Sequence, residues 1–338
     1  MNSPKSRFAR KNLYELSWMA IILACVCLST QVLLGAHQAA TGTQAPQTPA
    51  NPPAAQPVEG ETFGTAQQAA DALIAAAGTF DEAALAKIFG PKGKKIIFTG
   101  ETPQDRERAL GFAVEAKEKT TVSVDPKTGT RAFVIVGDES WPFPVPIVKI
   151  NGKWSFDAKA GEKELLYRRV GANELDAIQI CHGFVEAQDD YAFRSRKLYN
   201  VNEYAQRVVS TPGKQDGLTW QTADGKWEGP IGEQIAKSIA QGYTPGETPY
   251  HGYFFKVLKG QGPAAPLGTL DYVIEGIMIG GFALVASPAE YRVTGVKTFM
   301  VSYDGVVYQK DLGPDTLEQF KKMERFNPDT SWQPVLDN

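Results

Sequence analysis

An Asp-Gly pair near the C-terminal end constrains the fold of this chain more than any other feature. Asp304 and Gly305 lie between two runs rich in β-branched and aromatic residues. Such a pair is typical of a hairpin, because a type I′ turn requires positive φ at both central residues. Two further short apolar runs precede it, each bounded by Gly or Pro. The sequence therefore predicts a four-stranded antiparallel meander, with strands at 253–258, 282–286, 298–303 and 306–309.

The segment between the first two of these strands, residues 259–281, is rich in Gly and Pro. This composition is unsuited to a helix interior, and a loop of this length is usually functional or mobile. Aromatic residues lie beside it in the sequence. They either fill the core of the sheet, which is the commoner case, or form a ligand surface. The residues that we expect at a partner or ligand surface are Tyr250, Gln261, Gly262, Pro263, Gly280 and Gly281.

Residues 1–40 have the three parts of a secretory signal peptide. A basic stretch at 5–11 precedes an uninterrupted apolar run at 18–28, and small residues surround Ala36. An uncleaved membrane anchor is the alternative, because the segment through Ala36 approaches the ~20 residues that a membrane span needs. We expect a periplasmic or secreted protein, which contacts the inner membrane only through this segment if it stays uncleaved.

Residues 41–62 are rich in Pro, Ala, Gln and Thr, which predicts a disordered linker. The remaining chain exceeds the usual size of a single core, so we expect two domains, at 63–160 and 161–338. The net charge of -3 argues against nucleic acid as a partner. Of the three cysteines, only Cys181 lies outside the targeting segment. A cleaved chain would therefore have no internal disulfide, which suits an exported bacterial protein with a sufficient core.

The pattern of the 63–160 domain is helices first and antiparallel strands afterwards, which indicates an α+β fold. Thr65 and Gln68 have the spacing of a capping box at the first helix, and Asn151 and Gly152 predict a tight turn between two strands. We expect a further short strand at 96–98. The order of elements is similar to the nuclear transport factor 2 family, whose cone-like curved sheet folds over helices and often holds a ligand. The catalytic Asp and His residues of that family have no counterparts in this sequence.

A long amphipathic helix is predicted from 161 to 193, with a kink near Gly171, before the meander. Leu175 and Ile178 fall on its expected core face, and Cys181 shares that face. Cys181 is therefore expected to be a small buried apolar residue rather than a nucleophile. A further short helix is expected at 231–241.

Known catalytic motifs are missing from the sequence. It has no Walker-type phosphate loop, no dinucleotide fingerprint, no His-Glu-x-x-His and no calcium-loop spacing, so we expect neither cofactor nor metal. Cys181 and His182 are neighbours on a helix and point in different directions. A Cys-His nucleophile would need His251 within hydrogen-bond reach of Cys181.

Several motifs resemble the bacterial family called domain of unknown function 2950, over about 63–332. The resemblance implies an exported envelope protein and brings no activity with it. The motifs include Phe143-Pro144-Val145-Pro146, Gly152-Lys153-Trp154, Ser210-Thr211-Pro212-Gly213-Lys214, Gln261-Gly262-Pro263 and Asp304-Gly305-Val306-Val307-Tyr308.

The C-terminal half is also similar in its order of elements to the globular heads of type IV pilins and pseudopilins. In those proteins a helix packs against a four-stranded meander. This chain departs from them, because its helix lies in the middle of the chain and no prepilin cleavage motif precedes it. The resemblance therefore implies a fold and not filament assembly.

Three functions stay open. The first is a non-enzymatic interaction or structural module that presents residues 259–281 to an envelope protein. The second is a periplasmic protein that binds a small ligand, in a pocket of the N-terminal domain or at the domain boundary. The third is an enzyme of unknown class that uses Cys181 and His251.

Overall fold

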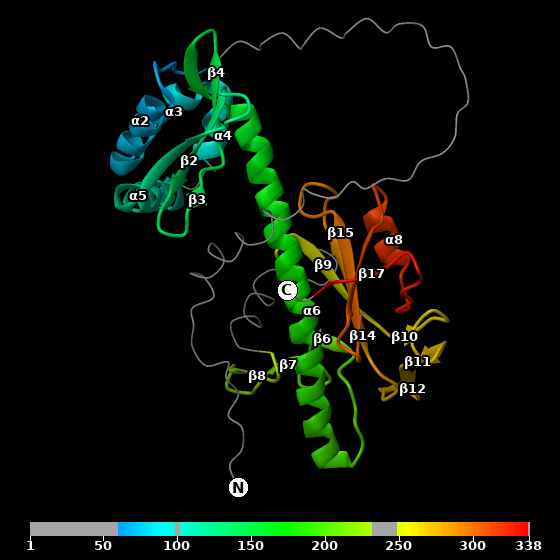
Figure 1. Ribbon diagram of the computed structural model, residues 1–338. Helices are drawn as coiled ribbons and strands as arrows, with labels where there is room; N and C mark the ends of the chain where they lie inside the picture. Colours follow the sequence, from blue (N-terminus) through cyan, green and yellow to red (C-terminus); the bar gives the residue numbers. More distant parts are fainter. Residues whose placement is uncertain (1–59, 99–101, 232–248, 337–338) are drawn as a thin grey trace, which may run out of the picture. The chain divides into compact units, whose positions relative to one another are not determined.

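The computed structural model describes residues 60–98, 102–231 and 249–336 (Figure 1). The expected targeting segment lies outside these residues. The expected linker also lies outside them, except for 60–62, and so does the helix expected at 231–241, except for residue 231. Two compact units divide the chain between Arg168 and Arg169. Both contain helices and antiparallel strands, which confirms the α+β class. Among the described residues, no helix combines the length and apolar character that crossing a membrane requires.

The first unit begins with helices. The Thr65 hydroxyl accepts a hydrogen bond from the Gln68 amide, as the predicted capping box requires. The Gln68 side chain accepts one from the Gly64 amide, one residue before the N-cap, instead of from the Thr65 amide. The prediction of a strand at 96–98 is wrong. Residues 94–97 form a helical turn whose apolar side chains pack on the core, and this packing overrides their strand preference. The helices are α2 (Ala66–Thr79), α3 (Glu82–Phe89), η2 (Pro91–Gly93), α4 (Lys94–Ile97) and α5 (Thr102–Glu118).

One antiparallel sheet completes the first unit. Its order is β1-β2-β4-β5, and β3 pairs with the other end of β2. The predicted tight turn joins β4 and β5, and its residues Asn151 and Gly152 have φ of 51° and 81°, as a type I′ turn requires. Helices α2, α3 and α5 cover one face of the sheet, and α6 begins at the other (Figure 1). The strands are β1 (Thr120–Val124), β2 (Arg131–Val136), β3 (Trp141–Pro142), β4 (Ile147–Ile150) and β5 (Lys153–Phe156).

Helix α6 (Ala158–Tyr199) runs without interruption through Gly171 and is longer than predicted. Leu175 is not on the core face as expected, since 46% of it is exposed. The buried stripe instead contains Ala177 and Cys181, and Leu175 lies about 200° around the helix from Ala177. Hydrogen bonds fix this rotation, because Glu174 Oε1 accepts from the amides of Val296 and Lys297 at 2.8 and 3.0 Å.

The predicted meander is present in the second unit and gains a fifth strand from the C-terminal end. The sheet has the order β17-β16-β15-β14-β9, and every neighbouring pair is antiparallel. A separate small sheet, β6-β7-β8, follows α6. The strands are β6 (Arg207–Val209), β7 (Gly217–Gln221), β8 (Trp227–Glu228), β9 (Tyr253–Leu258), β14 (Ala283–Pro288), β15 (Lys297–Ser302), β16 (Val307–Asp311) and β17 (Gln333–Pro334).

The turn between β15 and β16 differs from the predicted type. Gly305 has φ of 77°, whereas Asp304 is not at positive φ, so the turn is not type I′. The Gly305 amide donates to the Ser302 carbonyl at 2.9 Å, and Asp304 Oδ1 accepts from the Ser302 hydroxyl and the Val306 amide. The Asp304 side chain thus stabilises a loop that is longer than the two-residue turn predicted here.

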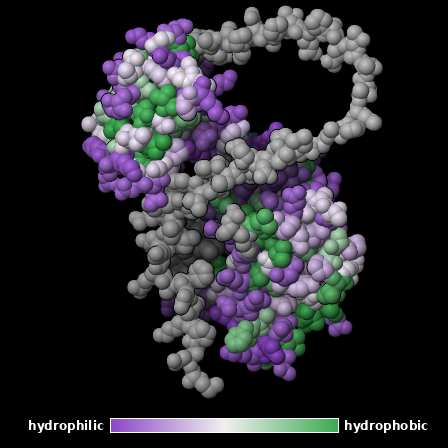
Figure 2. Space-filling model, in the orientation of Figure 1, coloured by the Kyte–Doolittle hydropathy of each residue, from purple (hydrophilic) through white to green (hydrophobic). Residues whose placement is uncertain are grey.

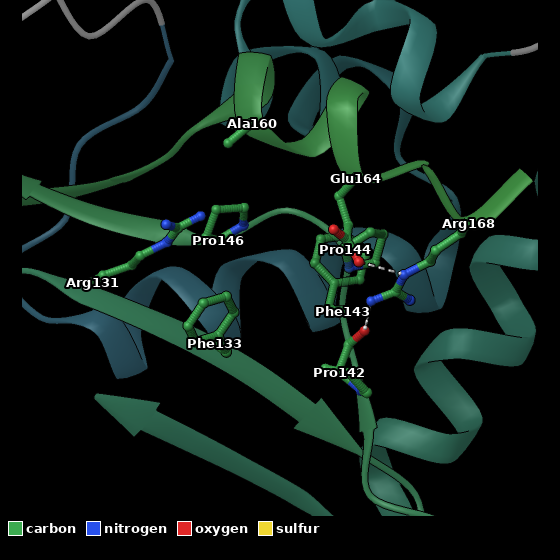
Figure 3. Close-up of a pocket in the computed structure, with 9 residues that line it drawn as sticks. All are labelled: Arg131, Phe133, Pro142, Phe143, Pro144, Pro146, Ala160, Glu164 and Arg168. Carbon is green, nitrogen blue, oxygen red and sulfur yellow. Dashed lines mark hydrogen bonds and ion pairs between the residues drawn. The ribbon is translucent and has the colours of Figure 1, made fainter. Parts of the chain in front are cut away.

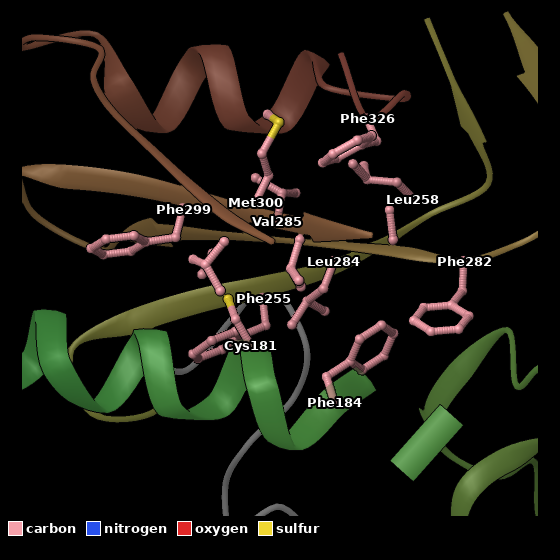
Figure 4. Packing of buried hydrophobic residues seen from close by; sticks show 14 of the residues in the cluster. Cys181, Phe184, Phe255, Leu258, Phe282, Leu284, Val285, Phe299, Met300 and Phe326 are labelled. Carbon is pink, nitrogen blue, oxygen red and sulfur yellow. The ribbon is translucent and has the colours of Figure 1, made fainter. Parts of the chain in front are cut away.

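The core of the second unit lies on both faces of the five-stranded sheet. Figure 4 shows Cys181 and Phe184 of α6 on the side of Phe255 and Leu284, and Met300 on the opposite side. Helix α8 (Thr316–Lys322) covers that opposite side (Figure 4). The sheet is therefore the middle layer of three.

Candidate interaction surface

Residues 259–281 form two short antiparallel ribbons rather than an irregular loop. In the first ribbon, β10 (Gly260–Gln261) pairs with β11 (Leu270–Asp271). In the second, β12 (Val273–Ile274) pairs with β13 (Ile277–Met278). The two residues between β12 and β13, Glu275 and Gly276, have φ of 50° and 83°, which is the backbone of a type I′ turn.

The buried side chain of Gln261 stabilises the first ribbon through hydrogen bonds. It is fully buried, and its Nε2 donates to the carbonyl of Gly268 at 2.7 Å and to that of Pro266. Its Oε1 accepts from the hydroxyl of Tyr272 at 2.9 Å. A buried amide is costly unless its donors and acceptor are satisfied, and here all are. Gln261 therefore fixes the tip of the first ribbon and is not itself accessible to a partner.

Leu267 lies at that tip, between the two carbonyls that Gln261 binds. Its φ is 69°, in the left-handed region, which costs a non-glycine residue roughly 1–2 kcal/mol. Its side chain is 86% exposed. The fold therefore holds a bulky apolar side chain in water in an unfavourable backbone conformation.

Further apolar side chains are exposed on the second ribbon. Ile274 and Ile277 are cross-strand partners, with exposed fractions of 47% and 46%. Ile279 is also exposed, while Met278 between them points the other way and is fully buried. We call these exposed side chains the ribbon surface. Figure 2 shows hydrophobic atoms gathered at the lower right of the molecule, where Figure 1 places the ribbons. The ribbon surface consists of Leu267, Ile274, Ile277 and Ile279.

Gly280 and Gly281 allow the second ribbon to pack closely. A Cβ at Gly280 would lie 2.5 Å from the carbonyl oxygen of Asp271, and one at Gly281 would lie 2.9 Å from the ring of Tyr272. Gly281 also has φ of 133°, which disfavours other residues. The amides of Ile279 and Gly280 both donate to the Tyr272 carbonyl at 3.0 Å. These glycines serve the framework of the ribbons.

The remaining predicted surface residues lie in two places. Gly262 is buried, and its amide donates to the carbonyl of Phe326 at 2.8 Å. Pro263, next to it, is exposed. Tyr250 belongs to the turn before β9, where its ring centroid lies 4.4 Å from that of His251. The structure thus brings five of the six predicted residues into the ribbons and their ends, and Tyr250 is outside them.

Cys181 and His251 have different environments. Cys181 is fully buried, and burial raises the pKa of its thiol to about 12. His251 is half exposed, and its Nδ1 lies 2.5 Å from Oδ2 of Asp176. A thiol with such a pKa stays protonated at neutral pH, and the thiolate is the nucleophile. These positions do not favour a Cys-His pair. In the described ranges, no cluster of three or more His, Cys, Asp or Glu could hold a metal ion.

The isoleucines of the ribbon surface were absent from the residues predicted at a site. The signal that could have found them is the Glu275-Gly276 pair between Ile274 and Ile277, which is a two-residue hairpin pattern with apolar partners on both sides.

The fold and the ribbons define an α+β protein that exposes an apolar surface on a hydrogen-bonded frame. The chain belongs to the family described as protein of unknown function (DUF2950), whose model matches residues 60–335. This membership confirms the resemblance found in the sequence motifs. No curated protein and no solved structure matches the chain. The similarity to pilin heads and to the nuclear transport factor 2 family therefore stays a prediction.

Proposed function

We propose that this protein is a non-enzymatic interaction module of the bacterial envelope, and that its ribbon surface docks into an apolar groove of a partner protein. The observation that carries the proposal is Leu267, which is held at positive φ with its side chain in water. Strained conformations persist where the surrounding structure over-determines them, and they cluster at functional sites. Gln261 supplies the restraint.

The charge at the second ribbon indicates the chemistry of the partner. Glu275 is exposed at the turn between Ile274 and Ile277, and no basic residue of the described chain lies within ion-pair distance of it. Interfaces typically combine an apolar centre with a polar rim of complementary charge. We therefore propose a partner whose apolar groove has a lysine or arginine at its edge.

The envelope location rests on the N-terminal sequence. The basic stretch, the apolar run and the small residues of 1–40 support export, to the periplasm or beyond, with an inner-membrane tether if the segment stays uncleaved. Fractionation of the producing cells, followed by N-terminal sequencing of the protein, tests this part. Recovery of the intact N-terminus in the cytoplasmic fraction would contradict it.

Site-specific photo-crosslinking in those cells tests the docking surface. A photoreactive amino acid replaces Ile277 in one protein and Val306 in a control. Val306 is also an exposed apolar residue at a hairpin turn of the same unit, with an exposed fraction of 38%, but it lies outside the ribbons. We expect one defined adduct from position 277 and none from position 306.

The captured protein is then purified and its affinity for the wild type and for Ile277→Asp is compared. We expect at least a roughly tenfold loss of affinity for the variant, because a carboxylate is costly to bury in an apolar groove. Deletion of the whole segment would be a poorer test, since it removes the buried Tyr272 and Met278. Adducts only between copies of this chain, or equal adducts from both positions, would contradict the proposal.

A further inference from the structure

The first unit contains a cleft of about 200 Å³ on the sheet face where α6 begins. Strand β2 supplies one wall, the connection between β3 and β4 a second, and the first turns of α6 a third (Figure 3). This cleft is separate from the ribbon surface, which belongs to the other unit. Its lining residues include Arg131, Phe133, Phe143, Pro146, Glu164 and Arg168.

Proline explains why the sheet is open at this position. Pro142, Pro144 and Pro146 have no amide hydrogen, so the connection cannot continue a full hydrogen-bonded ladder along β2. Only the Phe143 amide makes such a bond, to the carbonyl of Val134 at 2.7 Å. The edge of β2 therefore pairs fully only at its two ends, with β3 and β4, and rigid proline rings border the gap between them.

One of the two arginines in the cleft, Arg168, already makes hydrogen bonds to neighbouring protein groups. Arg168 donates through Nε to Glu164 at 3.0 Å and through a terminal nitrogen to the carbonyl of Pro142 at 2.9 Å. Its guanidinium also lies 5.1 Å from the ring centroid of Trp141. The charges of Glu164 and Arg168 thus compensate each other, and the pair forms a fixed polar wall.

The second arginine, Arg131, has no acidic partner among the described residues. Its guanidinium lies 5.3 Å from the ring centroid of Phe133, and Figure 3 shows it beside Pro146, across the cleft from Arg168. The cleft therefore has a net charge of one positive unit, with the uncompensated cation next to apolar rings. A guanidinium is suited to bidentate binding of a carboxylate.

We propose that this cleft binds a small carboxylate with an apolar body. The carboxylate accepts hydrogen bonds from Arg131, and the apolar body lies against Phe133 and the proline wall. The size of the cleft fits this class of ligand, since sites for drug-sized ligands begin at roughly 300 Å³. The inference concerns ligand binding by the first unit and does not depend on the docking proposed for the second.

Calorimetric titration of the protein purified from the producing cells with sodium benzoate tests the proposal. Benzamide serves as the uncharged counterpart of the probe, and inorganic phosphate serves as an anion without an apolar body. The test variant is Arg131→Gln. Its matched control is Arg106→Gln, because Arg106 also lies over a phenylalanine ring, that of Phe80 at 6.0 Å, in the same unit but outside the cleft.

We expect saturable binding of benzoate, with at least roughly tenfold weaker binding of benzamide and phosphate. Arg131→Gln should weaken benzoate binding by a similar factor, and Arg106→Gln should leave it unchanged. Glu164→Gln provides a variant with the opposite expectation: it removes a negative charge and should strengthen benzoate binding severalfold.

The result that overturns the proposal is equal binding of benzoate to the wild type and to Arg131→Gln, or no saturable binding of benzoate. Tighter binding of phosphate than of benzoate also overturns it, because the apolar body would then contribute nothing. Circular dichroism checks that each variant is folded. If Arg131→Gln is not folded, Glu164→Gln gives the test: stronger binding of benzoate supports the proposal, and unchanged or weaker binding overturns it.

Discussion

The hydroxyl of Tyr272 donates a 2.9 Å hydrogen bond to Oε1 of Gln261, and both side chains are fully buried. Tyr272 lies between β11 and β12, and its carbonyl accepts from the amides of Ile279 and Gly280. Tyr272 therefore links the two ribbons. Its side chain contacts Gln261, which fixes the tip of the first ribbon, and its backbone carbonyl binds the residues that follow the second ribbon. Burial raises the pKa of Tyr272, so the hydroxyl stays a donor at neutral pH.

Replacing Tyr272 by Phe should lower the free energy of unfolding by about 1–3 kcal/mol, because Gln261 Oε1 is left buried without its donor. Urea unfolding of the wild type and the variant measures the difference. Tyr308→Phe is the control, since no hydrogen bond of the Tyr308 hydroxyl occurs among the described residues. Equal losses in the two variants would show that the hydroxyl of Tyr272 does not satisfy a buried group.

Replacing Leu267 by Asn should stabilise the protein by up to about 1 kcal/mol. Asn tolerates the left-handed region in which Leu267 lies, and the lost side chain makes little contact in a position 86% exposed. The same change should weaken binding of the partner captured at position 277. Thermal unfolding gives the first quantity and titration the second. A destabilised variant would show that the Leu267 side chain supports the fold.

Alkaline pH should destabilise the wild type more than Cys181→Ala. The thiol keeps its proton in the folded state up to a pKa of about 12 but ionises near 9.0 when unfolded. Between these values the unfolded state binds fewer protons, so stability falls as pH rises, by about 1.4 kcal/mol per pH unit.

The Cys181→Ala variant lacks this contribution, although it loses about 1 kcal/mol of packing at neutral pH. The stability of the wild type minus that of the variant, about 1 kcal/mol at about pH 8, should therefore fall by about 1.4 kcal/mol by about pH 10, so that its sign reverses. Denaturant unfolding at both pH values measures it. A constant difference would mean that the thiol is not protected from ionisation.

Two glycines of the second unit should respond to alanine in opposite directions. A Cβ meets no atom within 4 Å at either Gly305 or Gly183, so the space around them is equivalent. Gly305 has φ of 77°, and alanine there should cost about 1 kcal/mol. Gly183 is inside α6, where alanine should gain about 0.5–1 kcal/mol. Chemical denaturation distinguishes the signs, and a loss at both positions would contradict the argument.

Local signals account for much of the fold. The Asp304-Gly305 pair located a hairpin correctly, but its turn type followed from side-chain hydrogen bonds of Asp304 that no dipeptide rule contains. The face of α6 was misplaced at Leu175, because contacts of Glu174 with the distant amides of Val296 and Lys297 set the helix rotation. Periodicity predicts a helix but not which partners fix it.

The candidate sites were less predictable. Gly and Pro in 259–281 indicated a loop, whereas the framework depends on a buried amide, that of Gln261, whose partners lie up to eleven residues away. Exposure of Ile274 and Ile277 is a tertiary property, since sequence alone does not tell which apolar residues are covered. The ion pair between Glu164 and Arg168 can be predicted from the sequence, because the two residues have the i,i+4 spacing of a helix. The lack of an acidic residue near Arg131 cannot be predicted in this way.

The three prolines of the cleft wall limit how that wall can be observed. From 142 to 146, only Phe143 and Val145 have an amide hydrogen. Amide hydrogen exchange and amide-detected magnetic resonance therefore report on this wall at two positions. The Phe143 amide is bound to Val134 and should exchange slowly whatever occupies the cleft. Changes at this wall are better followed through the methyl groups of Val145 or through carbon-13 signals of the proline rings.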